Sequence, residues 1–340
     1  MGVLMNRLGL KGIHFVEFAA HDPKPLRKLF IEFGFSHTHT HATKAIELYQ
    51  QNEILFFLNF DPKSFGHDFS GLHGPSISSM GWHMENSKEA QKGAIALGAK
   101  AAPRVDYSVA AIEGIGGSLI YFVTPSPKLL GDMGFQALGS QIQPDKGFTR
   151  IDHLTHNVYK GTMGDWADFY KNIFGFTEVR YFDIRGRKTG LQSFALRSPC
   201  GTFSIPINEA NEKKSQINEY LDRYHGPGIQ HLAFATNDIL ASLDKLEGTS
   251  IETLDILESY YATVFDRVPN VVEDHKSIEK HKVLVDGDEK GYLLQIFTKD
   301  VIGPIFIEII QRKNHHSFGE GNFQALFDSI ERDQQRRGVL

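Results

Sequence analysis

The sequence predicts an α+β protein of two similar halves, each holding two modules with a curved open sheet or barrel, followed by a C-terminal helix. Three observations predict this fold. Segments of the first 140 residues recur after residue 150, short strand patterns alternate with single amphipathic helices, and the last segment carries a helical apolar stripe. Strands mixed with single helices favour this arrangement over a doubly wound parallel sheet.

The clearest repeat pairs residues 12–35, GIHFVEFAAHDPKPLRKLFIEFGF, with residues 150–176, RIDHLTHNVYKGTMGDWADFYKNIFGF. Each segment is typical of a strand, a loop and an amphipathic helix that stops at Phe-Gly-Phe. In the second copy Gly175 is expected to end the helix, because four apolar residues recur at helical spacing just before it. Those residues are Trp166, Phe169, Tyr170 and Ile173.

Two further repeats complete the halves. Residues 81–101 and 228–246 each predict a strand with a histidine, then an Asn and a helix, while residues 116–125 and 290–300 each predict a Gly-led strand. The halves meet around residues 139–150. The expected domains are therefore residues 1–140 and residues 150–340.

The C-terminal segment, residues 319–337, is expected to form a helix packed on the body of the protein. Its apolar residues recur at helical spacing and make one stripe. They are Phe323, Leu326, Phe327 and Ile330.

Composition excludes several classes of function. The net charge is −5 and no basic tract occurs, which argues against a nucleic-acid partner. The longest apolar runs, such as residues 54–60, are too short to span a membrane. Cys200 is the only cysteine, so neither an internal disulfide nor a cysteine-based zinc site is expected. No signal peptide pattern is seen at the N-terminus, and the cytoplasm is the expected location.

Three predicted strands of the second half each carry one potential metal ligand. His153 lies in IDHLTHNV, His231 in GIQHLAFAT and Glu308 in FIEII, at intervals of 78 and 77 residues. This spacing predicts equivalent strands of successive modules, so the side chains should converge. A buried carboxylate needs a cation, and two imidazoles with one carboxylate suit non-haem Fe(II). Zinc, with water as a fourth ligand, is an alternative ion for the same residues.

The first half should lack such a site. His14 and His83 are expected at positions like those of His153 and His231, but the matching late strand, SLIYFV, has no carboxylate. The first half is therefore interpreted as a scaffold without a metal.

Other histidine and acidic motifs favour structural roles. His37, His39 and His41 are expected on one solvated face of a strand, and His156 is expected to be structural. The segment DGDEKG, residues 286–291, lacks the later ligands of a calcium loop and predicts a hairpin turn.

Five motifs together resemble the 4-hydroxyphenylpyruvate dioxygenase family of the vicinal-oxygen-chelate superfamily. They are IDHLTHNV, GIQHLAF, GYLLQIFTK, FIEIIQRK and FGEGNFQALFDSIERDQ. The resemblance covers nearly the whole chain and is strongest from residue 150 onward. It implies modules of the βαβββ type, one Fe(II) per chain on His153, His231 and Glu308, and a homo-oligomer, either dimer or tetramer.

The resemblance also implies the reaction and the residues that contact the substrate. The 2-keto acid 4-hydroxyphenylpyruvate and dioxygen would give homogentisate and carbon dioxide, a step in tyrosine and phenylalanine catabolism. Phe323 and its helix would act as a gate. The implied catalytic residues are Gln216, Gln295 and Asn322. The implied substrate-binding residues are Ser193, Asn208, Gln230, Phe297, Phe306, Phe318 and Phe323.

Three alternatives stay open at this level. 4-Hydroxymandelate synthase is similar in fold, ligands and substrate but hydroxylates the benzylic carbon, and Asn322 and Pro206 resemble the ring-hydroxylating branch instead. An extradiol catechol dioxygenase shares the module repeat, but the QIFTK and FIEIIQR motifs disfavour it. A ligand-sequestering protein of the same superfamily is a non-enzymatic alternative, and it gives no reason for Glu308.

Overall fold

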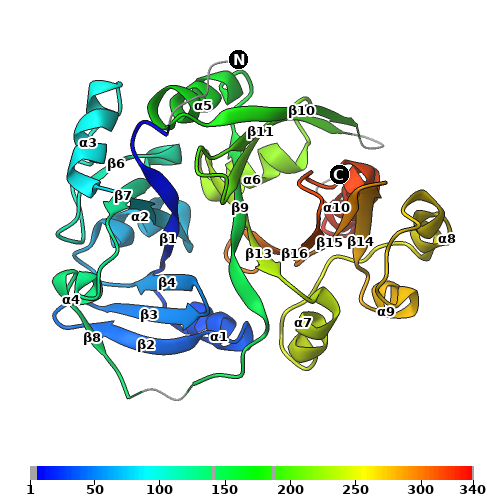
Figure 1. Ribbon diagram of the computed structural model, residues 1–340, viewed down its shortest axis with the longest axis horizontal. Coiled ribbons are helices and arrows are strands. Elements are labelled where there is room, and N and C mark those ends of the chain that lie inside the picture. Colours follow the sequence, from blue (N-terminus) through cyan, green and yellow to red (C-terminus); the bar gives the residue numbers. More distant parts are fainter. Residues whose placement is uncertain (1–5, 140–141, 186–188, 339–340) are drawn as a thin grey trace.

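The computed structural model describes residues 6–139, 142–185 and 189–338 and confirms the α+β fold (Figure 1). The strands of the first half are β1 (Leu10–Ala19), β2 (Ser36–His41), β3 (Ile46–Gln51), β4 (Ile54–Asn59), β5 (Ser76–Met84), β6 (Ala111–Glu113), β7 (Leu119–Val123) and β8 (Phe135–Ala137). Its helices are α1 (Lys24–Glu32), α2 (Phe65–His73), α3 (Ser87–Ala96), the short η1 (Ile115–Gly117) and α4 (Leu129–Asp132).

The second half has the same kind of composition. Its strands are β9 (Phe148–Val158), β10 (Thr177–Arg185), β11 (Gly190–Arg197), β12 (Ser204–Ala210), β13 (Gly228–Thr236), β14 (Leu284–Asp288), β15 (Gly291–Phe297) and β16 (Phe306–Lys313). Its helices are α5 (Met163–Phe169), η2 (Tyr170–Phe174), α6 (Gln216–Tyr224), α7 (Ile239–Leu246), α8 (Glu258–Arg267), α9 (His275–Lys280), η3 (Glu320–Asn322) and α10 (Phe323–Arg336).

Each half is organised around one mixed sheet of eight strands. The orders are β6-β7-β5-β1-β4-β3-β2-β8 and β10-β11-β12-β9-β13-β16-β15-β14. The central pairs, β1 with β5 and β9 with β13, are antiparallel, and every central strand has a parallel neighbour on its other side. The halves therefore share the topology of seven strands, in which β7 corresponds to β16, and they differ at one edge strand each, β8 beyond β2 and β14 beyond β15.

This topology corrects one of the predicted repeats. The predicted repeat equates the segment 116–125, which contains β7, with the segment 290–300, which contains β15. In the sheets, however, β7 pairs in parallel with β5 as β16 pairs with β13, so the counterpart of β7 is β16 and not β15. A Gly-led apolar strand looks alike in either place, so the local pattern did not identify the true counterpart.

A β-bulge interrupts the central strand pair at the same point in both halves. Ile13 and Phe15 pair with consecutive residues of β5, which leaves His14 as the extra residue. Ile151 and His153 pair with consecutive residues of β13, which leaves Asp152 as the extra residue. The register therefore matches His153 with Phe15, and the prediction that His14 occupies its position is wrong by one residue.

The other two positions follow from the same register. Ser79 pairs with Glu17 of β1 as His231 pairs with Thr155 of β9, so Ser79 and not His83 is the counterpart of His231. On the neighbouring strands, Tyr121 pairs with Gly81 as Glu308 pairs with Ala233.

Aromatic rings fill the first half where the second half has the three candidate ligands. The Phe15 ring stacks on Phe57 with centroids 4.2 Å apart, and its centroid lies 6.0 Å from that of Tyr121. Within the described parts of the chain, each group of side chains that could hold a metal ion lies in the second half.

The predicted helices at residues 150–176 and 319–337 are present. The first consists of α5 and one π-helical turn, η2, and Gly175 ends it with a φ of 81°. The second consists of η3 and α10. Helices α2, α6, α8 and α9 were not predicted, because their segments lack a clear copy of an apolar stripe or lie outside the repeats.

Two smaller expectations have different outcomes. His37 pairs with Tyr49 and His39 with Leu48, so a bulge at Thr38 places these histidines on opposite faces of β2, contrary to the prediction. The hairpin turn at residues 286–291 is confirmed, because β14 and β15 pair closely on either side of it.

The two halves share one hydrophobic core. Trp82 of the first half packs on Phe174 and Phe203 of the second, with ring centroids 4.6 and 5.6 Å apart. Phe33 packs on Phe234 in the same way at 5.6 Å. None of the described helices has the length and apolar character needed to cross a membrane.

Candidate active site

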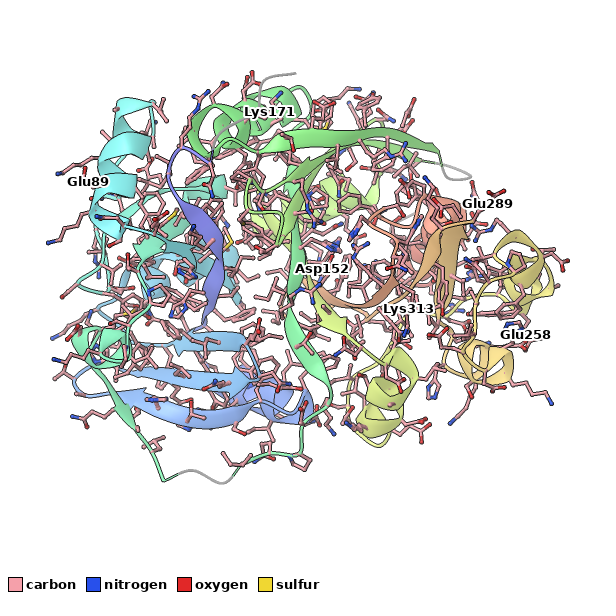
Figure 2. All side chains as sticks on the ribbon, in the orientation of Figure 1. Glu89, Asp152, Lys171, Glu258, Glu289 and Lys313 are labelled. Atoms are coloured by element: carbon pink, nitrogen blue, oxygen red, sulfur yellow. The ribbon has the colours of Figure 1, made fainter. Side chains whose placement is uncertain are left out.

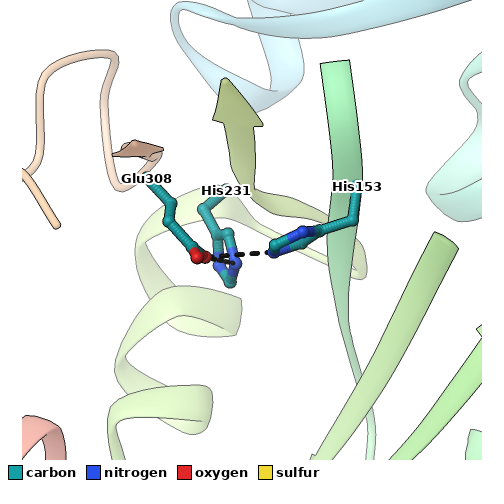
Figure 3. A group of neighbouring side chains, drawn as sticks. All are labelled: His153, His231 and Glu308. Atoms are coloured by element: carbon teal, nitrogen blue, oxygen red, sulfur yellow. Dashed lines mark hydrogen bonds and ion pairs between the residues drawn. The ribbon is translucent and has the colours of Figure 1, made fainter. Parts of the chain in front are cut away.

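His153, His231 and Glu308 point toward one another from three adjacent strands (Figure 3). The strand register brings them together. Ala233 of β13 pairs with His153 on one side and with Glu308 on the other, and His231 lies two residues away on the same face of β13. The Glu308 Oε2 atom is 3.0 Å from His153 Nε2 and 3.4 Å from His231 Nε2. One ligand atom from each residue lies within 4.8 Å of the others.

All three residues are buried, with 3, 8 and 3% of the surface of His153, His231 and Glu308 exposed. Burial by itself raises the pKa of Glu308, but the two histidines lower that pKa more, to about 2. Burial lowers the pKa of His153, whereas Glu308 and Asp152 raise it to about 9. The site therefore holds a charged carboxylate in the protein interior beside two imidazoles.

The outer nitrogens of both imidazoles already have oxygen acceptors. His153 Nδ1 is 2.9 Å from Asp152 Oδ1, and His231 Nδ1 is 3.0 Å from Gln230 Oε1. When Nδ1 donates its hydrogen to such an oxygen, Nε2 presents a lone pair. The raised pKa of His153 retains a proton between its Nε2 and Glu308, and a divalent transition metal can take the place of that proton. Two imidazoles and one carboxylate are a donor set that fits such an ion.

Asp152 and Arg312 form an outer layer that the sequence reasoning missed. Arg312 Nε and Nη2 donate to the two carboxylate oxygens of Asp152 at 2.9 and 2.8 Å, and Arg312 Nη1 donates to the carbonyl of Ser317 at 2.6 Å. Burial raises the pKa of Asp152, but Arg312 and His153 hold it well below its usual range. The sequence feature that could have predicted this layer is the position of Asp152 directly before the candidate ligand His153, because histidine ligands commonly donate to a carboxylate.

A cavity with an empty volume of about 690 Å³ adjoins the three candidate ligands. Its walls contain the predicted residues Ser193, Asn208, Gln216, Gln230, Gln295, Phe297, Phe306, Phe318 and Phe323. Further wall residues, not predicted as such, are Thr155, Phe182, Ile184, Leu191, Pro206, Leu326, Phe327 and Ile330. Two features of the sequence could have predicted these wall residues: the alternation of inward and outward side chains along strands β9 to β12, and the apolar stripe of α10.

Asn322 does not line this cavity, contrary to the prediction. It is fully buried, and its Oδ1 accepts hydrogen bonds from the Tyr260 hydroxyl at 2.6 Å and from Arg267 Nη2 at 3.3 Å. These contacts hold the start of α10 against α8, so the side chain is turned away from the candidate ligands.

Two buried polar atoms in the cavity wall have no hydrogen-bond partner within the described residues. They are Gln295 Oε1 and Thr155 Oγ1. Gly319 covers Gln295 closely, because a Cβ at Gly319 would lie 2.5 Å from Gln295 Oε1. Since buried polar groups are normally paired, these atoms are available to a bound molecule.

The repeated modules and the His-His-Glu group define a protein of the vicinal-oxygen-chelate class. Residues 4–129 match the family described as "Hydroxyphenylpyruvate dioxygenase, HPPD, N-terminal", and residues 150–294 match the glyoxalase, bleomycin resistance protein and dioxygenase superfamily. The chain is 44% identical to 4-hydroxyphenylpyruvate dioxygenase of Legionella pneumophila (strain Corby), over 98% of each chain. It therefore belongs to the 4-hydroxyphenylpyruvate dioxygenase family and is an oxidoreductase.

Two further similarities bear on the reaction. The chain is 57% identical to Protein MelA of Shewanella colwelliana, over 98% of this chain and 99% of MelA. A mutant of 4-hydroxymandelate synthase from Streptomyces coelicolor superposes with a TM-score of 0.82, covering 96% of this chain and 99% of the synthase. At 23% identity, this second likeness shows a shared fold.

Proposed function

We propose that the protein converts 4-hydroxyphenylpyruvate and dioxygen into homogentisate and carbon dioxide, with one Fe(II) held by His153, His231 and Glu308. The observation that carries this proposal is the convergence of these side chains at the wall of an aromatic cavity. When bound, Fe(II) supplies activation of dioxygen and a Lewis acid for the 2-keto acid.

The aromatic wall residues exclude water and pack against the substrate ring. Phe306 stacks on the His231 imidazole with centroids 4.7 Å apart, and Phe318 meets His153 edge-on at 5.9 Å. These rings thus hold the two imidazoles in place and surround the reacting end of the substrate.

The polar wall residues orient the substrate without adding charge beside the candidate ligands. Gln295, with its unpaired Oε1, is an acceptor for a phenol hydroxyl, and Asn208 and Gln216 offer further amide groups. Gln230 is a positioning residue, because its Oε1 accepts a hydrogen bond from His231 Nδ1 and so orients that imidazole. Ser193 supplies a hydroxyl on the β11 side of the cavity.

Helix α10 covers the cavity as the proposed gate. Phe323, Leu326, Phe327 and Ile330, its apolar stripe, all line the cavity. The far end of the helix is tied to α6, because Gln334 Nε2 donates to Glu219 Oε2 at 2.8 Å and Arg337 forms an ion pair with Glu219. Opening the cavity requires these contacts to separate.

Product analysis tests the proposal. Protein freed of metal is reloaded anaerobically with Fe(II), mixed with 4-hydroxyphenylpyruvate and air, and followed for oxygen uptake and released products. We expect one homogentisate and one carbon dioxide for each dioxygen consumed, and no turnover after loading with Zn²⁺. Formation of 4-hydroxymandelate would instead identify a synthase. Binding of 4-hydroxyphenylpyruvate without oxygen uptake would identify a sequestering protein, and ring cleavage in a parallel assay with a catechol would identify an extradiol dioxygenase.

The synthase alternative gains no support from the cavity itself. Of the two residues that resemble the ring-hydroxylating branch, Pro206 lines the cavity and Asn322 does not. The 44% identity to a 4-hydroxyphenylpyruvate dioxygenase supports the proposed reaction. The dimeric or tetrameric assembly and the cytoplasmic location stay predictions.

A further inference from the structure

A second cavity lies between the two halves, apart from the substrate cavity. Its walls come from β1 and β5 of the first half and from β9, β11 and β16 of the second, and its empty volume is about 1440 Å³. Asp152, one of its wall residues, lies in the middle of the molecule (Figure 2). Exposed residues such as Arg150 and Thr202 form part of the wall, so solutes have access to the cavity.

Positive charge predominates in this cavity although the chain carries a net charge of −5. The cationic side chains in its wall are Lys11, which pairs with Glu85 at 3.4 Å, and Arg150, Arg197 and Arg312, whereas the carboxylates in the wall are Glu53 and Asp152. A local reversal of the overall charge favours an anionic ligand, because a concave site focuses the electrostatic field.

Two of the arginines have no carboxylate partner in the described parts of the chain. Arg312 is neutralised by Asp152. The Arg197 side chain bonds only to the Gly201 carbonyl and the Ser204 hydroxyl among the described residues, and the Arg150 side chain makes no hydrogen bond or ion pair with any of them. Burial lowers the pKa of Arg197; the charge of Asp152 opposes this, and the charges of Arg312 and Arg150 add to it. Guanidinium groups gathered in this way are suited to phosphate and carboxylate groups.

A histidine of the first half adds a hydrogen-bonding group. His14, the extra residue of the β1 bulge, lines the cavity, and its Nε2 is buried without a partner among the described residues. The site is therefore built by both halves, and neither half contains it alone.

Strand geometry places this cavity at one end of the candidate active site. Arg197 lies four residues after Ser193 on β11, and Arg312 lies four residues after Glu308 on β16, so each arginine shares a strand face with a residue of the substrate cavity. Arg312 and Asp152 then connect this end of the sheet to His153.

We propose that the cavity between the halves binds a small polyvalent anion, a metabolite bearing phosphate or several carboxylates. Arg150 and Arg197 are its main ligands, and His14 contributes a hydrogen bond. This site is separate from the proposed substrate cavity and does not depend on the proposed reaction.

Calorimetric titration of the full-length protein with pyrophosphate and with citrate, at constant ionic strength, tests the proposal. We expect one anion per chain, and binding weakened at least about ten-fold in the Arg150→Gln/Arg197→Gln double variant. Stronger binding of one probe identifies phosphate or carboxylate as the preferred group. The matched control is Arg7→Gln, an exposed arginine outside both cavities, which should bind like the natural sequence.

Absence of binding to the natural sequence, or equal binding by the double variant, overturns the proposal. Circular dichroism and thermal unfolding without anion establish that each variant is folded. If the half-buried Arg197 proves necessary for folding, the single Arg150→Gln variant decides, because Arg150 is exposed and its side chain makes no hydrogen bond or ion pair with a described residue. Its affinity should then fall at least about three-fold, and an unchanged affinity refutes the site.

Discussion

Two buried glutamates show how their neighbours determine the charge of a carboxylate. Glu308 lies between two imidazoles, and they lower its pKa to about 2 despite burial. Glu17 lies inside the first half, where burial and Asp106 raise its pKa to about 7, although hydroxyl and amide donors from Tyr107, Ser78 and Asn59 partly oppose this. One site thus retains a negative charge for a cation, and the other favours the neutral acid.

We expect Glu308→Gln to weaken Fe(II) binding at least about 100-fold, because it removes the only anionic ligand of the group. Iron retained after anaerobic loading and dialysis, measured by a colorimetric chelator, checks this. Glu17→Gln is the matched control, since it changes a buried carboxylate of the half without the His-His-Glu group. Retention of one iron per chain by Glu308→Gln would contradict the proposed centre.

Glu17 should make the stability of the protein fall as pH rises. Between its unfolded pKa of 4.5 and its folded pKa of about 7, the native state holds a proton that the unfolded chain has released. This stabilisation is complete below pH 4.5 and is lost by pH 7. Relative to the natural sequence, Glu17→Gln should therefore gain about 3 kcal/mol in free energy of unfolding across this range.

Urea unfolding of both chains at several pH values measures this difference. Parallel stability curves for the natural sequence and Glu17→Gln between pH 4.5 and 7.5 would show that Glu17 is ionised in the native state throughout. Glutamine keeps the shape of the side chain and the Oε1 acceptor for Ser78 and Asn59, but its Nε2 cannot accept from Tyr107. That loss is the same at every pH, so the pH dependence of the difference reports the titration of Glu17.

At the scale of elements, strand pairing decided which sequence inferences held. The order of strands and helices in the repeats, the C-terminal helix and the three converging side chains could be predicted, because periodicity and spacing are local or regular. The counterparts of His153 and His231 could not, because the first half carries other histidines, His14 and His83, near the equivalent positions, and only the strand pairing shows that Phe15 and Ser79 occupy them. The direction of Asn322 likewise depends on Tyr260 and Arg267, which come from a helix outside the repeats.

Helix α10 should depend on Glu219 for its attachment. Glu219→Ala removes the acceptor of Gln334 and Arg337, so amide hydrogen exchange in residues 323–336 should accelerate at least about five-fold. Exchange of the central strands should not change. Arg104→Gln is a suitable control, because it breaks a surface ion pair with Asp68 far from this helix in the sequence. Unchanged exchange in α10 would show that its apolar stripe and its other hydrogen bonds, such as those of Ser329 and Arg332 to the Asp255 carbonyl, hold it without Glu219.

At the scale of the whole molecule, the halves are joined by a common core and not by a linker alone. Aromatic side chains of both halves pack on one another, with Trp82 of β5, Phe174 of η2 and Phe203 before β12 at one contact. Gly116 approaches the second half so closely that a Cβ there would lie 2.0 Å from the Pro227 carbonyl oxygen. The halves should therefore unfold together.

Trp82→Ala tests this coupling. The fully buried indole leaves a large cavity when it is removed, and we expect a loss of about 3–5 kcal/mol in unfolding free energy. Tryptophan fluorescence from Trp166 in the second half and far-ultraviolet circular dichroism should still report a single transition, moved to lower denaturant. Two separated transitions would show that the halves fold independently.

The bulge shared by β1 and β9 bears on how this chain arose. Both copies interrupt the same strand pair at the same residue, although only one copy carries the ligand group. The simplest ancestry is the duplication of a module pair that already had this interruption. At the ligand positions, divergence then exchanged side chains on strands whose pairing stayed the same, and these are now Phe15, Ser79 and Tyr121 in one copy and His153, His231 and Glu308 in the other.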